Sequence, residues 1–275
     1  MGTTLSRPYK ISKPLPPTPT VQISLLRAEK ISFIGCPADL LWLILIINWK
    51  CWRRTTSSSS TSDSSPSSTH FNCSPEYEEE HSDASIIDQI RDFDPIAWAH
   101  DTTVFTPEPD TQERIHLASA YQSAVLIYYH RVLSPVPSST FAGNDTILST
   151  LVSLAHSTLL HLSHLPNTHP FIKAILWPTF IAAAEVSAAP QRDLARHLLH
   201  TFWIGYRSVN CVNAAGVLEE MWKRCDAISA ALSDEAKELL ESGGFWSKGV
   251  LNFGEEKGDG RKDWVVGGDV DWLFV

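Results

Sequence analysis

The chain of 275 residues changes its pattern of apolar and polar positions about a third of the way along. From residue 85 onward, apolar residues recur every three or four positions, which is the period of a helix with one buried face. Almost no segment alternates with the two-residue period of a strand. We therefore predict an all-α, multi-helix domain whose helices are joined by short turns, preceded by a disordered Ser/Pro-rich N-terminal region.

Helix boundaries follow from proline, glycine and capping residues. Asp94 is a good N-cap and Pro95 suits the first helical position, so residues 85–100 are predicted to hold two short helices in series. Other helices are expected over 111–133, 144–164 and 170–187, from Pro190, from Asn213, and over 233–242.

The segment 170–187 contains "AILWPTFIAAAEV", in which Trp177 and Pro178 interrupt a run of apolar and small residues. A proline inside a helix removes a hydrogen-bond donor, so we expect a kink there. Glu185 is a lone carboxylate in this run, and two roles are open to it. It could be a general base, or it could pair with Arg192 or Arg207 on the next helix, and the absence of a second catalytic group favours the ion pair.

The first third of the chain divides by composition. Residues 1–30 include "KPLPPTPT" and are predicted to be a disordered, extended tail. Residues 31–54 form an apolar helix whose run over 40–49 is ten residues long, whereas a membrane span needs about 20, so we expect a buried helix. Residues 55–84 pass from a Ser/Thr tract to an acidic cluster and are predicted to be a disordered insert. The remaining 85–275 form the main helical region.

The composition excludes several classes of protein. The formal net charge is −9 and no stretch gathers enough Lys and Arg to neutralise a row of phosphates, which argues against direct nucleic-acid binding. The five cysteines are odd in number, widely spaced and without a CxxC pair, so neither a disulfide framework nor a zinc cluster is indicated. A reducing, intracellular compartment is the expectation.

Sequence signatures of catalysis are missing. The chain has no GxSxG elbow, phosphate-binding GxxxxGK[ST] loop, GxGxxG turn or HExxH helix. The stretch "GEEKGDGRKD" lacks the ligand spacing of a calcium loop. We therefore expect no enzyme activity and no cofactor.

Histidines gather on the helix predicted over 144–164 and just after it: His156, His161, His164 and His169. His161 and His164 are three residues apart and share a face, as two metal ligands would need. No nearby Cys or acidic residue completes a ligand set. We therefore predict ordinary polar positions and no metal, and keep as an alternative a helical binding or enzymatic domain with a small-molecule pocket between its helices.

Six separated motifs occur in a recognisable order: "IGCPADLLWLI", "IRDFDPIAWA", "AYQSAVLIYYHRVL", "LWPTFIAAAEV" followed by Arg192, "RSVN", and "VLEEMWKR". Together they resemble the fungal-specific transcription factor domain, over roughly residues 34–275. The residues that match its pattern are Trp177, Pro178, Glu185, Arg192, Asn210 and Trp222.

The resemblance implies an all-helical regulatory domain, a nuclear location and a role in transcription by RNA polymerase II. It also implies protein partners, namely a co-regulator, a DNA-binding partner or a second copy of the chain, and it makes Glu185 a structural anchor. Family members that read DNA carry six cysteines holding two zinc ions near the N-terminus. The first 33 residues here contain no cysteine, so we expect neither zinc nor direct DNA binding of this chain.

Two further expectations concern the ends of the chain. "MGTTLS" fits the loose pattern for N-myristoylation at Gly2, and with residues 40–49 it keeps a membrane-associated protein as an alternative, although a membrane location is not expected. "DWLFV", residues 271–275, is too apolar to be left in water, so we expect it to dock on the helices.

Overall fold

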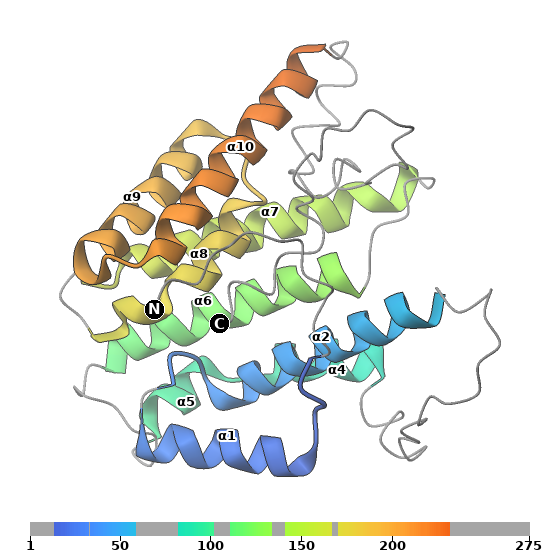
Figure 1. The fold of residues 1–275 in the computed structure, drawn as a ribbon, viewed down its shortest axis with the longest axis vertical. Helices are drawn as coiled ribbons and strands as arrows, with labels where there is room; N and C mark the ends of the chain where they lie inside the picture. Colours follow the sequence, from blue (N-terminus) through green and yellow to red (C-terminus); the bar gives the residue numbers. More distant parts are fainter. Residues whose placement is uncertain are drawn as a thin grey trace.

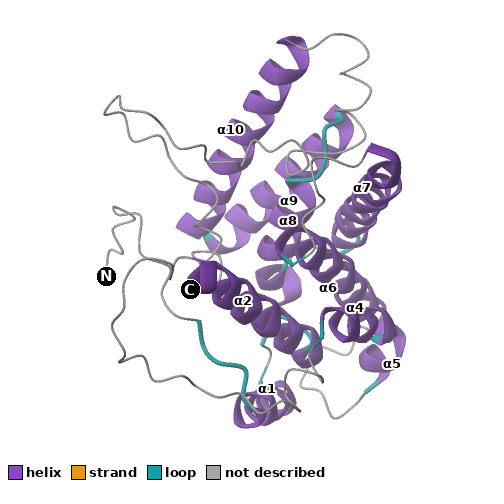
Figure 2. Ribbon diagram, turned by 90° about the vertical axis from the view of Figure 1, so that its right-hand side faces the viewer, coloured by secondary structure: helices purple, strands orange, loops and turns teal. Residues whose placement is uncertain are grey.

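The computed structural model describes residues 14–32, 34–58, 82–101, 111–133, 141–166 and 170–231, and every element in these ranges is a helix (Figures 1 and 2). The all-α prediction is confirmed. In chain order the elements are α1 (Pro19–Ile31), α2 (Ala38–Ser58), α4 (Asp83–Asp92), α5 (Pro95–His100), α6 (Thr111–Val132), α7 (Phe141–Ser163), the 3₁₀ helix η1 (Pro170–Ala174), α8 (Leu176–Ala183), α9 (Ala189–Tyr206) and α10 (Val209–Ala231).

Helix α6 runs through the middle of the molecule. Helices α1, α2, α4 and α5 lie on one side of it, and α7 to α10 lie on the other (Figure 1). It packs against α2, α4 and α5 as well as α7 and α8. This position follows from its sequence, because apolar and small side chains occupy several of its faces and are buried: Leu117, Ala118, Ala120, Tyr121, Ala124, Val125, Ile127, Tyr128 and Tyr129.

The apolar run over 40–49 lies in α2 and is covered by protein. Its buried residues are Leu40, Trp42, Leu43, Ile44, Ile46, Ile47 and Trp49. They belong to the same core as the side chains of α6. The prediction of a buried helix is confirmed, and among the described residues no helix combines the length and apolarity that a membrane span requires.

The N-terminal prediction was wrong for part of its range. Residues 19–31 form α1, where an extended tail over 1–30 was expected; residues 1–13 lie outside the described ranges. Thr18 is the N-cap, its Oγ accepting a hydrogen bond from the backbone N of Val21 (3.4 Å), and Pro19 is the first helical residue. Proline here supports a helix, because the first N–H groups of a helix have no internal partner.

The two short helices predicted after residue 85 are confirmed as α4 and α5. The side chain of Asp94 accepts hydrogen bonds from the backbone N of Ile96 (2.8 Å) and Ala97 (3.1 Å), and Pro95 follows it as the first helical residue. Helix α2 continues to Ser58 and α4 begins at Asp83, so the intervening insert is shorter than the predicted 55–84. Residues 59–81, the helix predicted over 233–242 and the "DWLFV" segment lie outside the described ranges.

The single kinked helix predicted over 170–187 is two elements. The chain forms η1, breaks at Ile175, and starts again as α8, which ends at Ala183. Pro178 is the third residue of α8 and not its middle. The ring of a proline clashes with the carbonyl four residues earlier, so the helix breaks one turn before Pro178. Within the first turn of α8, the missing N–H of Pro178 costs no hydrogen bond, because the first N–H groups of a helix have no internal partner.

Glu29 joins three helices on the α1 side of the molecule. The side chain is buried, and its Oε1 accepts hydrogen bonds from the backbone N of Ala38 (2.8 Å) and from Trp98 Nε1 (2.9 Å). It thus caps the start of α2 and holds α5 from a residue on α1. Burial raises the pKa of the Glu29 carboxyl, and the two hydrogen bonds oppose that rise.

Replacing Glu29 tests this capping role. Glu29→Ala leaves two buried donors unsatisfied and should lower the free energy of unfolding by about 2–3 kcal/mol. Glu29→Gln keeps an acceptor oxygen and should lose less than half of that. Urea denaturation of both variants measures the difference, with exposed Lys30→Ala as the matched control on α1. A Glu29→Ala variant as stable as Lys30→Ala would rule the cap out.

Candidate functional site

Helix α8 is the centre of the site that the sequence singled out. Every residue from Trp177 to Ala183 is buried, because α8 packs against α6, α7, α9 and α10. The ring of Trp177 stacks on Tyr121 with centroids 5.8 Å apart, and meets Tyr128 edge-on at 5.8 Å. Trp177 and Pro178 are therefore core residues, and they fix α8 against α6.

Glu185 pairs with Arg131 in the last turn of α6. The Nε of Arg131 donates to Oε1 of Glu185 (2.8 Å), and the second guanidinium nitrogen donates to Oε2 (2.6 Å). The exposed fractions of the two side chains are 8% for Arg131 and 0% for Glu185. The predicted pairing with Arg192 or Arg207 was wrong: the partner lies 54 residues earlier, a separation that helical spacing does not indicate.

The environment of Glu185 decides what it can do. Burial raises the pKa of its carboxyl, while the hydrogen bonds and charge of Arg131 oppose the rise. Both oxygens are already occupied by Arg131, and the side chain has no contact with solvent. A general base must reach a substrate proton, so this geometry argues against catalysis by Glu185 and favours a structural anchor.

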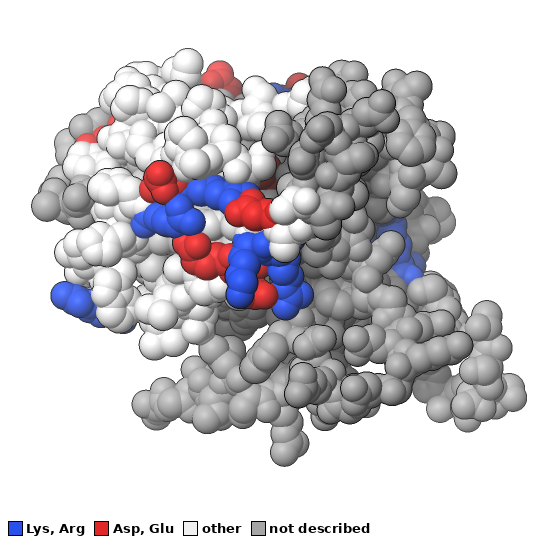
Figure 3. Space-filling model, turned by 90° about the horizontal axis from the view of Figure 1, so that it is seen from above, with Lys and Arg blue, Asp and Glu red and all other residues white. Residues whose placement is uncertain are grey.

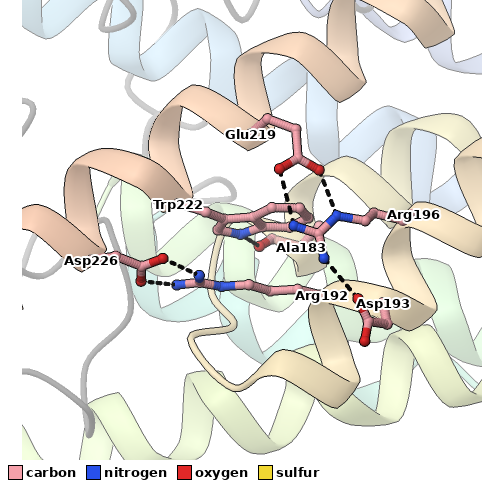
Figure 4. Close-up of polar contacts among 7 residues, drawn as sticks. All are labelled: Ala183, Arg192, Asp193, Arg196, Glu219, Trp222 and Asp226. Atoms are coloured by element: carbon pink, nitrogen blue, oxygen red, sulfur yellow. Dashed lines mark hydrogen bonds and ion pairs between the residues drawn. The ribbon is translucent and has the colours of Figure 1, made fainter.

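Arg192 on α9 and Trp222 on α10 lie against each other at the C-terminal end of α8. The indole Nε1 of Trp222 donates to the carbonyl of Ala183, the last residue of α8 (3.1 Å). Arg192 pairs with Asp226 through both terminal nitrogens, at 2.8 and 2.9 Å. Its guanidinium carbon lies 5.5 Å from the centroid of the Trp222 ring. Figure 4 shows this arrangement joining α9, α10 and the end of α8.

A second arginine flanks the same ring (Figure 4). The guanidinium carbon of Arg196 lies 4.8 Å from the Trp222 centroid. Arg196 donates to both oxygens of Glu219 (2.6 and 3.0 Å) and to Asp193 (2.7 Å). These hydrogen bonds lower the pKa of Glu219 and raise that of Arg196.

Sequence reasoning missed four members of these contacts: Arg131, Arg196, Glu219 and Asp226. For three of them a signal existed, because Arg196 is four residues after Arg192, and Glu219 and Asp226 are three before and four after Trp222. Asn210 lies apart from this group. It is half-buried in the first turn of α10, about 18 Å along the helix from Trp222.

Helices α9 and α10 carry charged side chains of both signs. In the view from above, Lys and Arg side chains are interleaved with Asp and Glu side chains in one cluster (Figure 3). Its ion pairs include Arg192 with Asp226, Arg196 with Glu219, and Arg224 with Glu220. Such a mixed surface does not present the continuous positive charge that binds a phosphate backbone.

Two of the histidines singled out in the sequence, His161 and His164, contact a third on α6. His161 Nδ1 lies 2.9 Å from His116 Nδ1 on α6, and the ring of His164 stacks on His116 with centroids 4.5 Å apart. His156 is exposed, and His169 lies outside the described ranges. Within the described ranges, no group of three or more His, Cys, Asp or Glu side chains could hold a metal ion.

Comparisons with known proteins agree with this architecture. The family model of the fungal specific transcription factor domain matches residues 7–272, which extends the sequence resemblance toward the N-terminus. The chain therefore belongs to the fungal-specific transcription factor domain family. It is also similar to the acriflavine sensitivity control protein acr-2 of Neurospora crassa, with 26% identity over 162 residues. That match covers 58% of this chain and only about a quarter of the relative. No solved structure is significantly similar to the chain.

The buried ion pair between Arg131 and Glu185 predicts that the stability lost on mutation depends on pH for one partner and not for the other. Arg131→Met and Glu185→Leu should each lower the free energy of unfolding by about 3–5 kcal/mol, because each leaves a buried charge without its partner. The stranded carboxylate in Arg131→Met can take up a proton, whereas the stranded guanidinium in Glu185→Leu stays charged. The loss in Arg131→Met should therefore shrink as the pH falls from 8 to 5, and the loss in Glu185→Leu should persist.

Denaturation curves of both variants and the parent at several pH values measure this effect. The double variant Arg131→Met/Glu185→Leu should recover most of the lost stability, because no charge is then stranded. The exposed pair supplies the control, since Arg196→Met should cost no more than about 1 kcal/mol. Equal pH dependence in the two single variants would contradict the asymmetry.

The histidine contact predicts how stability depends on pH. Burial, and then the neighbouring His116 and His164, lower the pKa of His161 below its usual 6.5. As the pH falls through 6.5, His161 binds a proton in the unfolded chain more readily than in the folded chain. The free energy of unfolding therefore decreases as the pH falls. His161→Gln should make this decline shallower between pH 7.5 and 5.5. Thermal unfolding measures it, and His156→Gln, at an exposed position of α7, should leave the slope unchanged.

Proposed function

We propose that this chain is the helical regulatory domain of a fungal transcription regulator, working in the nucleus through contacts with other proteins. The observation that carries the proposal is the state of the residues that match the family pattern. Trp177, Pro178 and Glu185 are buried in the core, and Arg192 and Trp222 clamp α9 and α10 to α8. These residues build a rigid scaffold, and a scaffold regulates through what binds its surface.

Two observations favour protein partners over the other roles considered. The buried, fully paired Glu185 supports a role without catalysis. The mixed charges on α9 and α10 support a chain that does not bind DNA by itself. The partner is then a co-regulator, a DNA-binding protein or a second copy of the chain. Nuclear location follows in this proposal from the family to which the chain belongs.

Tethering the domain to a promoter tests the proposal. We expect the full chain, fused to an unrelated DNA-binding module in a fungal cell, to change a reporter several-fold relative to the module alone. The destabilised Glu185→Leu should lose the effect in proportion to its loss of folded protein, and Lys30→Ala should retain it. Reporter output equal to that of the module alone, from a fusion that is folded and nuclear, would refute the regulatory role.

A mobility-shift assay with the purified chain separates direct from partner-mediated action. We expect no sequence-selective shift at physiological salt, because specific binding needs base contacts in addition to phosphate contacts. A selective shift that survives competitor DNA would show that the chain reads DNA itself.

A further inference from the structure

The connection between α9 and α10 carries an exposed apolar surface. We call residues 203–212 the elbow: the last turn of α9, the connection at 207–208 and the first turn of α10. Three aliphatic side chains here are more than half exposed: Ile204 58%, Val209 64% and Val212 52%. Val209 and Val212 are one helical turn apart, and Ile204 is within one turn of the connection. Three exposed aliphatic side chains within ten residues make this turn a candidate contact surface.

Two positive charges lie at this surface: Arg207 within the elbow and Lys173 on the neighbouring η1. The exposed Lys173 of η1 lies with its Nζ 5.1 Å from the ring centroid of Tyr206. Arg207, in the left-handed conformation that ends α9, lies with its guanidinium carbon 5.4 Å from the ring centroid of Trp203. No Asp or Glu occurs in residues 194–218 or 165–184, the two stretches that form this surface. The elbow therefore suits a ligand that combines apolar side chains with carboxylates.

We propose that residues 263–275 of the same chain, "DWVVGGDVDWLFV", dock on the elbow. This segment contains three aspartates, no Lys or Arg, and eight large apolar side chains, two of them Trp. Its composition is complementary to the elbow in two respects. Its apolar side chains can cover the exposed aliphatic side chains, and its aspartates can pair with Lys173 and Arg207. Tethering within one chain raises the effective concentration of the segment at the surface.

The length of chain permits this contact. Helix α10 has 23 residues, so its end is about 35 Å from the elbow. About thirty residues separate the end of α10 from Asp263, which could extend to about 100 Å.

Charge argues for this segment over a second copy of the chain. A symmetric dimer through the elbow would place the same surface on both partners. Lys173 and Arg207 of one copy would then approach Lys173 and Arg207 of the other, with no acidic residue of the elbow between them. Residues 263–275 supply the carboxylates that the elbow lacks.

Photo-crosslinking of the full chain tests the docking. With p-benzoylphenylalanine in place of Ile204, irradiation should join the elbow to a peptide within residues 263–275, in a product of monomer mass. The same probe in place of Ile23, which is 64% exposed on α1, should give at least fivefold less of this product. Mass spectrometry identifies the joined peptides. A product of dimer mass, or equal yields from the two positions, would overturn the proposal.

A charge exchange supplies the decisive variants. Asp269→Lys/Asp271→Lys should reduce the cross-link several-fold, and so should Lys173→Glu/Arg207→Glu. All four substitutions together restore opposite charges and should recover most of the yield. Lys173 and Arg207 are exposed, and circular dichroism checks that each variant is folded. Loss of cross-linking that the combined variant does not recover would show that charge complementarity does not hold the segment.

Discussion

The buried pairing of Arg131 with Glu185 fixes the central helix α6 against the end of α8. Arg131 stands at the end of α6, the helix shared by both layers, and Glu185 follows α8, around which α7, α9 and α10 pack. Because the pair is buried and bidentate, it tolerates little displacement of one helix relative to the other. Burial raises the pKa of the Glu185 carboxyl, because removing the charged form from water costs free energy and Arg131 offsets only part of that cost.

The contacts of Trp222, Arg192 and Arg196 at the end of α8 extend this constraint to the surface. Trp222 binds the carbonyl that α8 leaves without an internal partner, and Arg192 and Arg196 pack on its ring. Arg192 is largely buried, whereas Asp226 and Glu219, the acids paired with the two arginines, are more than half exposed. The inner side of this group is thus buried, and its outer acidic side chains are exposed.

Local chemistry predicted much of the fold from sequence. Asp94 followed by Pro95 located α5, and the three- and four-residue spacing located α6 and α7, because these signals act within one helix. Thr18 followed by Pro19 carries the same signal, but the neighbouring prolines hid it and α1 was missed. The partner of Glu185 could not be predicted, since it depends on how α6 packs against α8. Arg192 and Trp222 were identified by family pattern, and their contact with each other came only with the structure.

The elbow is one part of the fold that core packing does not explain. Asn210, which the sequence analysis matched to the family pattern, lies at the elbow in the first turn of α10 and not beside α8. Three exposed aliphatic side chains remain at the same place although the core is filled without them. Resistance to unwanted association would favour polar residues there, because exposed apolar surface promotes association. Their presence beside Lys173 and Arg207 is accounted for if an acidic, aromatic segment covers the elbow, and the final residues of this sequence have that composition.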